Sequence, residues 1–214
     1  MIGGHAATRL VGQRVALRPY SEGFDEAELR ALYRWARDPE LLRLTGGLPL
    51  DLSFARFREV FRDKLTRLDP TRELLYALLD EQGHLIGRIG LFALDPAAGS
   101  AELGIVLGER ASWGRARGRE AIGLLAGHAF GELKLSRILL HTYPENTRAQ
   151  RAFAAAGFRE TRRLRRFSLD RGTHDEIEMQ LVPADLERVQ SLAALLRWRE
   201  SESRPDRDAA AGEG

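Results

Sequence analysis

The segment from residue 104 to residue 130 constrains the fold most, because it places a strand, a small-residue basic turn and an amphipathic helix in direct succession. It reads GIVLGERASWGRARGREAIGLLAGHAF. Apolar residues recur over 118–133 at the offsets of one buried helical face: Ile122, Leu125, Ala126, Ala129, Phe130 and Leu133. A strand at 137–143 (RILLHTY) follows the helix. This part of the chain therefore resembles one strand–helix–strand crossover unit.

The rest of the chain alternates between helical and strand patterns. Three runs within 72–107, ELLYALLDE, HLIGRIGLFAL and SAELGIVLG, are separated by short turns and predict an antiparallel meander. Residues 37–52 contain Asp-Pro, Gly-Gly and Pro breaks and predict a loop-rich helical flap. The further expected elements are strands at 14–21, 160–169 and 174–182 and helices at 24–36, from about 53, and at 147–156. Their sum predicts an α+β domain.

The C-terminal end differs in composition from this domain, which we place at 12–182. Pro183 can open an amphipathic helix over 183–200, with apolar residues on one face. That helix either packs on its own domain or pairs with a second copy in a homodimer. Residues 201–214 (SESRPDRDAAAGEG) are too polar to pack and predict a disordered tail.

Composition excludes several classes of function. The 214-residue chain has no cysteine, which excludes disulfides, thiolate metal sites and a cysteine acyl-enzyme intermediate. A net charge of +2 is too small to indicate nucleic-acid binding unless the charge is concentrated on one face. No apolar run approaches the length of a membrane span, and we expect a cytoplasmic protein. The five histidines do not occur at metal-ligand spacing with carboxylates, so no metal is expected.

The turn at 113–119 is the strongest candidate for a binding site. Gly114, Ala116 and Gly118 keep side chains away from the backbone, and Arg115, Arg117 and Arg119 add positive charge. Free N–H groups and the positive end of the helix dipole favour a phosphate at such a turn. A tight turn with a solvated basic rim remains the alternative. The P-loop and dinucleotide-binding patterns do not fit these residues.

Three motifs in order resemble the GNAT acetyltransferase superfamily. WGRARGREA (113–121) looks like its pyrophosphate-binding motif, and PENTRAQRAFAAAGFRE (144–160) resembles the motif that follows. Gly172, Asp175 and Met179 resemble the family's final hairpin. The branch that acetylates ribosomal-protein N-termini is the most similar. The resemblance covers about residues 12–182 and implies a twisted, mostly antiparallel sheet of about seven strands, with helices on both faces and a splayed central pair of parallel strands.

The resemblance also implies acetyl-CoA as co-substrate and assigns residues to it. The strand before the turn, Ile105, Val106 and Leu107, would offer backbone groups to pantetheine. The turn would hold the pyrophosphate, through Trp113, Gly114, Arg115, Ala116, Arg117, Gly118 and Arg119. Asn146 would contact the pantetheine arm or shape its slot. Ala116 stands where glycine is usual, which costs little unless the residue needs a positive φ.

The expected chemistry is direct attack of an amine on the thioester. Many members have a tyrosine where this chain has Phe153, so that residue supplies no acid for the leaving thiol. A thiol of pKa about 8.5 can leave without a donor. An α-amine is about a tenth to a fifth neutral near pH 7, against under about 0.1% for a lysine amine, which favours α-amine acceptors. Glu102 is the candidate base; Tyr143 and His141 are candidates for a proton relay, with packing as the alternative.

Two other functions remain open from the sequence. One is a noncatalytic acyl-CoA-binding or regulatory module, which Phe153 and Trp113 permit. The other is a ribosome- or RNA-associated protein that uses its arginines as a phosphate-binding face, since all but two of its 33 basic residues are arginine.

Overall fold

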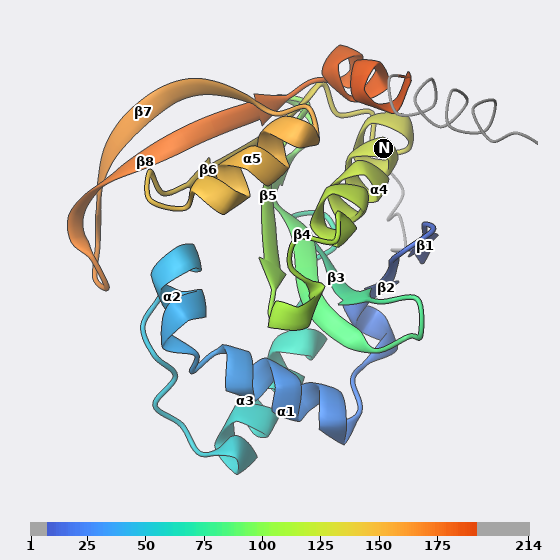
Figure 1. Cartoon of the computed structure of the whole chain (residues 1–214). Coiled ribbons are helices and arrows are strands. Elements are labelled where there is room, and N and C mark those ends of the chain that lie inside the picture. The colour runs from blue at the N-terminus through green and yellow to red at the C-terminus, as the bar shows by residue number, and fades with distance from the viewer. Residues whose placement is uncertain (1–7, 192–214) are drawn as a thin grey trace, which may run out of the picture.

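One eight-stranded sheet organises the molecule in the computed structural model, which describes residues 8–191 (Figure 1). The strand order is β1-β2-β3-β4-β5-β6-β8-β7. The strands are β1 Leu10–Val11, β2 Ala16–Pro19, β3 Leu74–Leu79, β4 Leu85–Asp95, β5 Ser100–Leu107, β6 Arg137–Thr142, β7 Arg159–Ser168 and β8 Gly172–Leu181. All neighbours are antiparallel except β5 and β6.

The helices separate into two groups, each with its own part of the core. One group is α1 Glu26–Trp35, α2 Pro39–Thr45 and α3 Phe54–Thr66, and its core cluster includes Leu32, Trp35 and Leu41. The other is α4 Arg117–Gly131 and α5 Thr147–Ala155, whose cluster includes Ile122 and Leu125. Short 3-10 turns lie at Tyr20–Glu22 and Arg110–Ser112. Both faces of the sheet are therefore covered.

The parallel strands β5 and β6 separate along their length. They pair only at Ser100↔Arg137, Ala101↔Ile138 and Glu102↔Leu139. β5 continues to Leu107 along β4, whereas its other edge has no strand partner beyond Glu102 in the described structure. Backbone groups on that edge are thus left available at the centre of the sheet.

The sequence predicted this architecture with small differences at its edges. The mixed sheet, the meander, the helices on both faces and the splayed parallel pair are confirmed. The sheet has eight strands rather than about seven, because Leu10–Val11 pairs with Ala16 and Leu17. The helix expected at 183–200 begins at Pro183 and is described to Ser191. The rest of this helix and the tail at 201–214 lie outside the described residues. The homodimer stays a prediction.

Candidate active site

The turn before α4 has an unusual backbone conformation. Gly114 and Ala116 both have positive φ, 75° and 58° respectively, and Ala116 is the N-cap residue of α4. No side chain caps this helix end, so its first N–H groups remain free to meet a ligand. The stated exception for Ala116 applies, because its φ is positive and the left-handed region costs a residue with a Cβ about 1–2 kcal/mol.

The three arginines of the turn point to different surroundings. Arg117 turns inward, where its guanidinium pairs with Glu81 and donates to the Ser112 hydroxyl over 3.1 Å. Arg115 and Arg119 are exposed and form no ion pair with any of residues 8–191. The turn therefore offers two free cations, while Arg117 fixes its shape.

Trp113 links the turn to the end of β5. Its indole Nε1 donates to the Leu107 carbonyl over 2.9 Å. The Arg148 guanidinium lies 3.4 Å from the indole ring centroid, and burial lowers the Arg148 pKa. The tryptophan that departs from the family pattern thus has a structural role, which is to tie α5 and β5 to the turn.

Two adjoining cavities meet at the gap between β5 and β6. The loop cavity, about 360 Å³, is lined by residues 105–107 and 112–119 and by one face of α5. The hairpin cavity, about 770 Å³, is lined by β4, β5 and β6, by the α2 end and by the β7–β8 hairpin. Their shared walls are Leu44, Thr45, Ile105, Val106, Asn146, Ala149 and Phe153. A ligand that fills the gap would therefore contact both cavities.

Asn146 and Phe153 shape the boundary between the cavities. The Asn146 side chain caps α5 by accepting from the Ala149 N–H over 3.2 Å, and its amide donates to the Leu44 carbonyl over 3.0 Å. Phe153 is 8% exposed and packs against Phe158. The oxygen and the nitrogen of the Asn146 side-chain amide thus both have partners within the protein, which supports its expected role in shaping the slot.

Glu102 lies at the point where the parallel strands separate. Its Oε1 is 3.1 Å from His141 Nδ1, and His141 Nε2 is 3.5 Å from Glu178 Oε2. Glu178 is buried, and its hydrogen bond from Arg162 holds the Glu178 pKa below its usual range. The chain thus places a carboxylate, an imidazole and a second, anchored carboxylate in a row, with Glu102 and His141 in the hairpin cavity.

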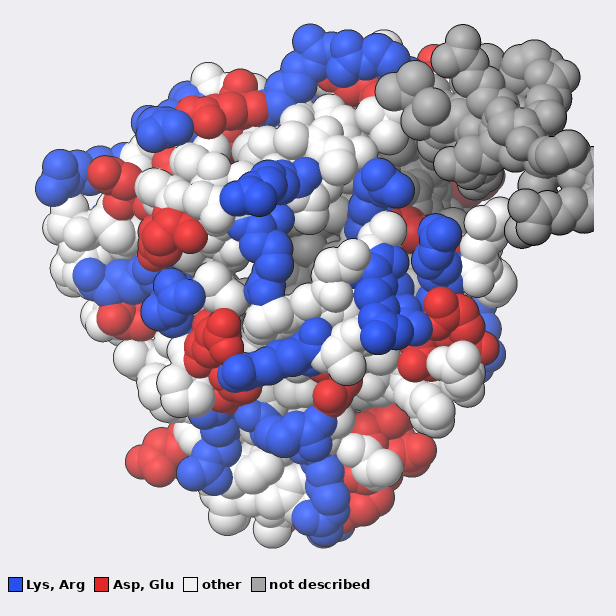
Figure 2. All heavy atoms as spheres, viewed as in Figure 1, with Lys and Arg blue, Asp and Glu red and all other residues white. Residues whose placement is uncertain are grey.

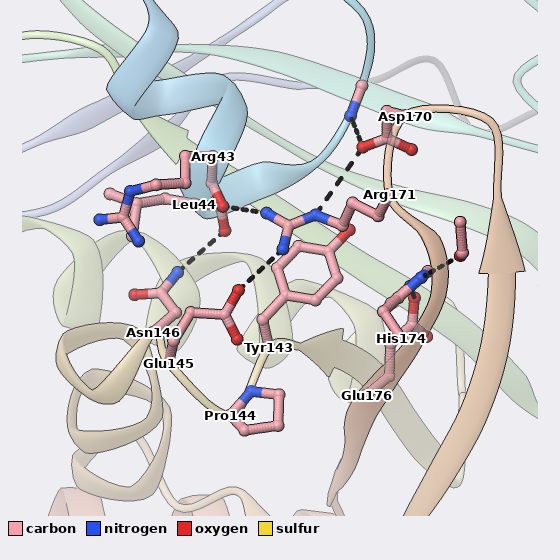
Figure 3. A network of polar contacts seen from close by, with 12 residues as sticks. Arg43, Leu44, Tyr143, Pro144, Glu145, Asn146, Asp170, Arg171, His174 and Glu176 are labelled. Atoms are coloured by element: carbon pink, nitrogen blue, oxygen red, sulfur yellow. Dashed lines mark hydrogen bonds and ion pairs between the residues drawn. The ribbon is translucent and has the colours of Figure 1, made fainter.

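Tyr143 lies apart from that row, under a network that joins the flap to the hairpin (Figure 3). The Arg171 guanidinium lies 3.7 Å from the Tyr143 ring centroid, pairs with Glu145 over 2.7 Å and donates to the Arg43 carbonyl. Burial raises the Tyr143 pKa. The Tyr143 hydroxyl lies against Gly46 of the flap, where an added Cβ would be 2.4 Å away.

A second contact closes the same side of the hairpin cavity. The Gly47 N–H donates to Asp170 Oδ2 over 2.8 Å (Figure 3). Hydrogen bonds from Ser168 and from Gly47 lower the Asp170 pKa, so this carboxylate stays charged. The flap is therefore fastened to the hairpin by both Asp170 and Arg171.

His174 on β8 faces two acceptors. Its Nδ1 is 3.0 Å from the Gly172 carbonyl and its Nε2 is 3.0 Å from Glu176 Oε1. A carbonyl and a carboxylate can only accept, so both nitrogens donate in the imidazolium form. The hydrogen bonds that the imidazolium donates, first to the Gly172 carbonyl and then to Glu176, raise the His174 pKa.

The surface charge around the site is mixed. Figure 2 shows basic side chains over the viewed face with acidic side chains between them. This face gives no support to an RNA-binding surface, which requires positive charge gathered on one face. In residues 8–191 no helix has the length and apolarity of a membrane span. The same residues contain no group of three His, Asp or Glu side chains placed to hold a metal ion.

Comparisons with known proteins agree with this geometry. The family model described as "Acetyltransferase (GNAT) domain" matches residues 14–159. An uncharacterized N-acetyltransferase, p20, of Bacillus licheniformis is 28% identical over 171 residues, which is 79% of this chain and 93% of p20. A GCN5-related N-acetyltransferase from Brucella melitensis superposes with a TM-score of 0.71 at 23% identity, over 88% of this chain and 86% of that one.

A spermidine N-acetyltransferase from Vibrio cholerae, solved with CoA and spermine, superposes with a TM-score of 0.67 at 22% identity. The match covers 80% of this chain and 97% of that chain. The chain belongs to the GNAT acetyltransferase family. It is an N-acetyltransferase that takes its acetyl group from acetyl-CoA.

Several residues of the site escaped the sequence prediction. Arg171 and Glu178 were not singled out, and neither were the contact between Glu102 and His141 and the hydrogen bonds of His174 with Gly172 and Glu176. The sequence carries no local signal for Glu178, because polar and apolar residues alternate in EIEMQL as they do on a half-exposed strand.

Proposed function

We propose that the acceptor is an α-amine, at the N-terminus of a polypeptide, and that Glu102 acts as the base that removes its proton. The observation that carries this proposal is the position of Glu102. It lies where β5 and β6 separate, it touches His141, and it faces a cavity that adjoins the loop cavity. A carboxylate at this gap opens on the cavity proposed for the acceptor and can receive the proton of its amine through bound water.

The reaction requires few groups from the protein. When bound, acetyl-CoA supplies the acetyl group as a thioester. The amine nitrogen forms a bond to the acetyl carbon, the carbon–sulfur bond breaks, and the amine proton passes through water in the hairpin cavity to Glu102. Backbone N–H groups on the free edge of β5, near Val106 or Leu107, stabilise the negative charge that develops on the acetyl oxygen.

His141 and Glu178 would hold the Glu102 carboxylate in place and receive its proton. Glu178 keeps its negative charge because Arg162 pairs with it over 2.8 Å. A fixed charge at the inner end of the row orients the imidazole, and the imidazole orients Glu102. This arrangement matters most for acceptors whose amine is mostly protonated near neutral pH.

Because residue 153 is phenylalanine, no tyrosine at this position can protonate the departing thiolate. Tyr143 is the remaining candidate for that acid. The raised pKa of Tyr143 keeps its hydroxyl protonated at neutral pH, as a donor must be. Its hydroxyl lies beside Gly46, however, which favours a role in the cavity wall. A thiol of pKa about 8.5 leaves readily, so the reaction proceeds without this donor.

The loop cavity is the proposed acetyl-CoA site. Free N–H groups at the start of α4, with Arg115 and Arg119, would bind the pyrophosphate. The pantetheine would follow the free edge of β5 past the boundary that Asn146 and Phe153 form. The residues proposed to contact the cofactor are Ile105, Val106, Leu107, Trp113, Gly114, Arg115, Ala116, Gly118, Arg119 and Phe153, with Arg117 and Asn146 positioning them.

The proposed acceptor follows the resemblance to the branch that acetylates ribosomal-protein N-termini. The spermidine N-acetyltransferase shares the fold at 22% identity, which carries no argument about the acceptor of this chain. Chemistry supports the α-amine, because its lower pKa leaves more neutral nucleophile than a polyamine or lysine amine has at the same pH.

Thioester consumption with N-terminal peptides, polyamines, amino acids and aminoglycosides tests the acceptor class. We expect turnover with peptides bearing a free α-amine. Turnover confined to polyamines or aminoglycosides would contradict the proposal.

Glu102→Gln tests the base. We expect kcat to fall by about a hundredfold, and the remaining rate to rise with pH up to about 8 as the α-amine itself loses its proton. Glu132→Gln is the matched control, since Glu132 is exposed at the end of α4 and lines neither cavity. A Glu102→Gln enzyme with the rate and pH profile of the control would remove Glu102 as the base.

A further inference from the structure

The wall of the hairpin cavity opposite the hairpin carries two cations that the reaction does not use. Lys64 on α3 and Arg88 on β4 both line this cavity. Both side chains are exposed, and no carboxylate of residues 8–191 forms an ion pair with either. Lys64 is one of only two lysines in the chain.

The place of Arg88 in the sheet is hard to explain by packing. β4 is a central strand, and its residues from Leu85 to Leu91 are buried except for Arg88. In register, Arg88 lies between Ala77 on β3 and Val106 on β5. A guanidinium on an apolar sheet face disrupts packing unless it faces solvent or a ligand, and here it faces the cavity.

Tyr20 and Phe61 connect the two cations. The Tyr20 hydroxyl is buried, which raises its pKa, and the neighbouring Arg88 charge opposes that rise. The Tyr20 ring centroid lies 6.1 Å from that of Phe61, and Phe61 precedes Lys64 by three residues on α3. Arg88 and Lys64 therefore flank one aromatic surface inside the cavity.

The carboxylates of the cavity, in contrast, are already paired. Glu102 contacts His141 over 3.1 Å. Glu176 contacts His174 over 3.0 Å and Arg166 over 3.7 Å. A polycationic acceptor would meet carboxylates that already have partners, whereas an anionic group would meet two cations that have no carboxylate partner among residues 8–191.

From this juxtaposition we infer that Arg88 and Lys64 form an anion subsite for the acceptor, so that the enzyme prefers N-terminal peptides with an acidic residue close to the α-amine. The inference rests on the proposed α-amine acceptor and adds that this acceptor carries a negative charge close to its α-amine. In register Arg88 lies beside Val106, near which the acetyl oxygen is proposed to lie, so the anion subsite adjoins the position of the reacting α-amine. Since an extended peptide advances about 3.3–3.6 Å per residue, the acidic side chain lies among the first few residues.

The test compares C-terminally amidated peptides of equal length that begin with alanine and carry glutamate, glutamine or lysine at positions two to four. We expect the wild-type kcat/KM for the acidic peptide to exceed that for the neutral one by about tenfold, mostly through KM. Added salt should reduce this preference. Free alanine and glutamate as acceptors distinguish a peptide side chain from an amino-acid carboxylate as the bound anion, and the inference requires the peptide to be preferred.

Substitutions locate the effect. Lys64→Gln and Arg88→Gln, alone and together, should lower kcat/KM for the acidic peptide and leave the neutral peptide and coenzyme A affinity unchanged. Arg88→Lys should restore part of the loss. Arg137→Gln is the matched control, because Arg137 is an exposed strand arginine outside both cavities. The Lys64 variant keeps the test valid if Arg88→Gln disturbs the core at Tyr20.

The outcomes separate the two proposals. Peptides acetylated without regard to charge, a preference for lysine peptides or spermidine, or an equal loss with all peptides in the variants would overturn the anion subsite alone. No acetylation of any peptide, with turnover of another amine, would overturn the α-amine proposal.

Discussion

The loop cavity takes most of its wall from one continuous stretch, residues 105–122, whereas the hairpin cavity takes its wall from segments between Tyr20 and Glu176. The first is formed by backbone conformation at a strand end, a turn and a helix start. The second depends on contacts between residues far apart in the chain, such as Gly47 with Asp170. A ligand common to a whole family can be held by the first kind of wall, while the second kind can change residue by residue with the acceptor.

The largest expected effect lies in the loop cavity alone. In Gly118→Glu, the new Cβ would lie 3.3 Å from Leu107 Cδ1, a flexible side-chain end that can move, so the fold should persist. A carboxylate at the helix start should repel the pyrophosphate and weaken coenzyme A binding by at least a hundredfold in calorimetry.

Gly127→Glu makes the same change at an exposed position further along α4 with no atom nearby, and it should bind as wild type does. Equal affinity in the two variants would remove the turn from the cofactor site.

A smaller effect is expected in the hairpin cavity alone. Arg171→Gln removes the stack on Tyr143 and the contacts to Glu145 and the Arg43 carbonyl. With the flap less firmly held, the acceptor KM should rise about fivefold while coenzyme A affinity stays the same, as steady-state kinetics would show.

Arg165→Gln, at an exposed residue of β7 outside both cavities, serves as the control. If Arg171→Gln changes coenzyme A affinity as much as acceptor KM, the two cavities do not have separate roles in binding cofactor and acceptor.

The smallest effect concerns stability. Ala116→Gly relieves the left-handed strain at the N-cap of α4, and we expect the free energy of unfolding to rise by about 0.5–1 kcal/mol in chemical denaturation. Ala111→Gly, two residues before the turn and without positive φ, should lower it instead. A loss of stability in both variants would show that the Ala116 conformation carries no strain.

Local patterns predicted the fold and the loop cavity well. Helical periodicity over 118–133 and the alternation of apolar runs with short turns determine which segments form α4 and the meander. The order of the three family motifs gave the splayed parallel pair. The positive φ of Ala116 could not be predicted, because alanine is compatible with many conformations and its φ is imposed by the junction of the β5 end with α4.

The hairpin cavity was predicted only in part, because contacts between residues far apart in the chain form it. Glu102 and Tyr143 were named, but the contact of Glu102 with His141 depends on the parallel register of β5 and β6. The clamp of Arg171 on the flap joins residues 128 positions apart. No local pattern encodes such a contact, which is a property of the completed sheet.

The residues shared by the two cavities give the enzyme a thermodynamic property. Because Val106, Asn146 and Phe153 face both sides of the gap, a cofactor arm between β5 and β6 would itself become part of the wall against which the acceptor packs. Each ligand should then bind more tightly when the other is present, and by the same factor in both directions. Such reciprocal coupling favours the ternary complex in which the amine attacks the thioester directly.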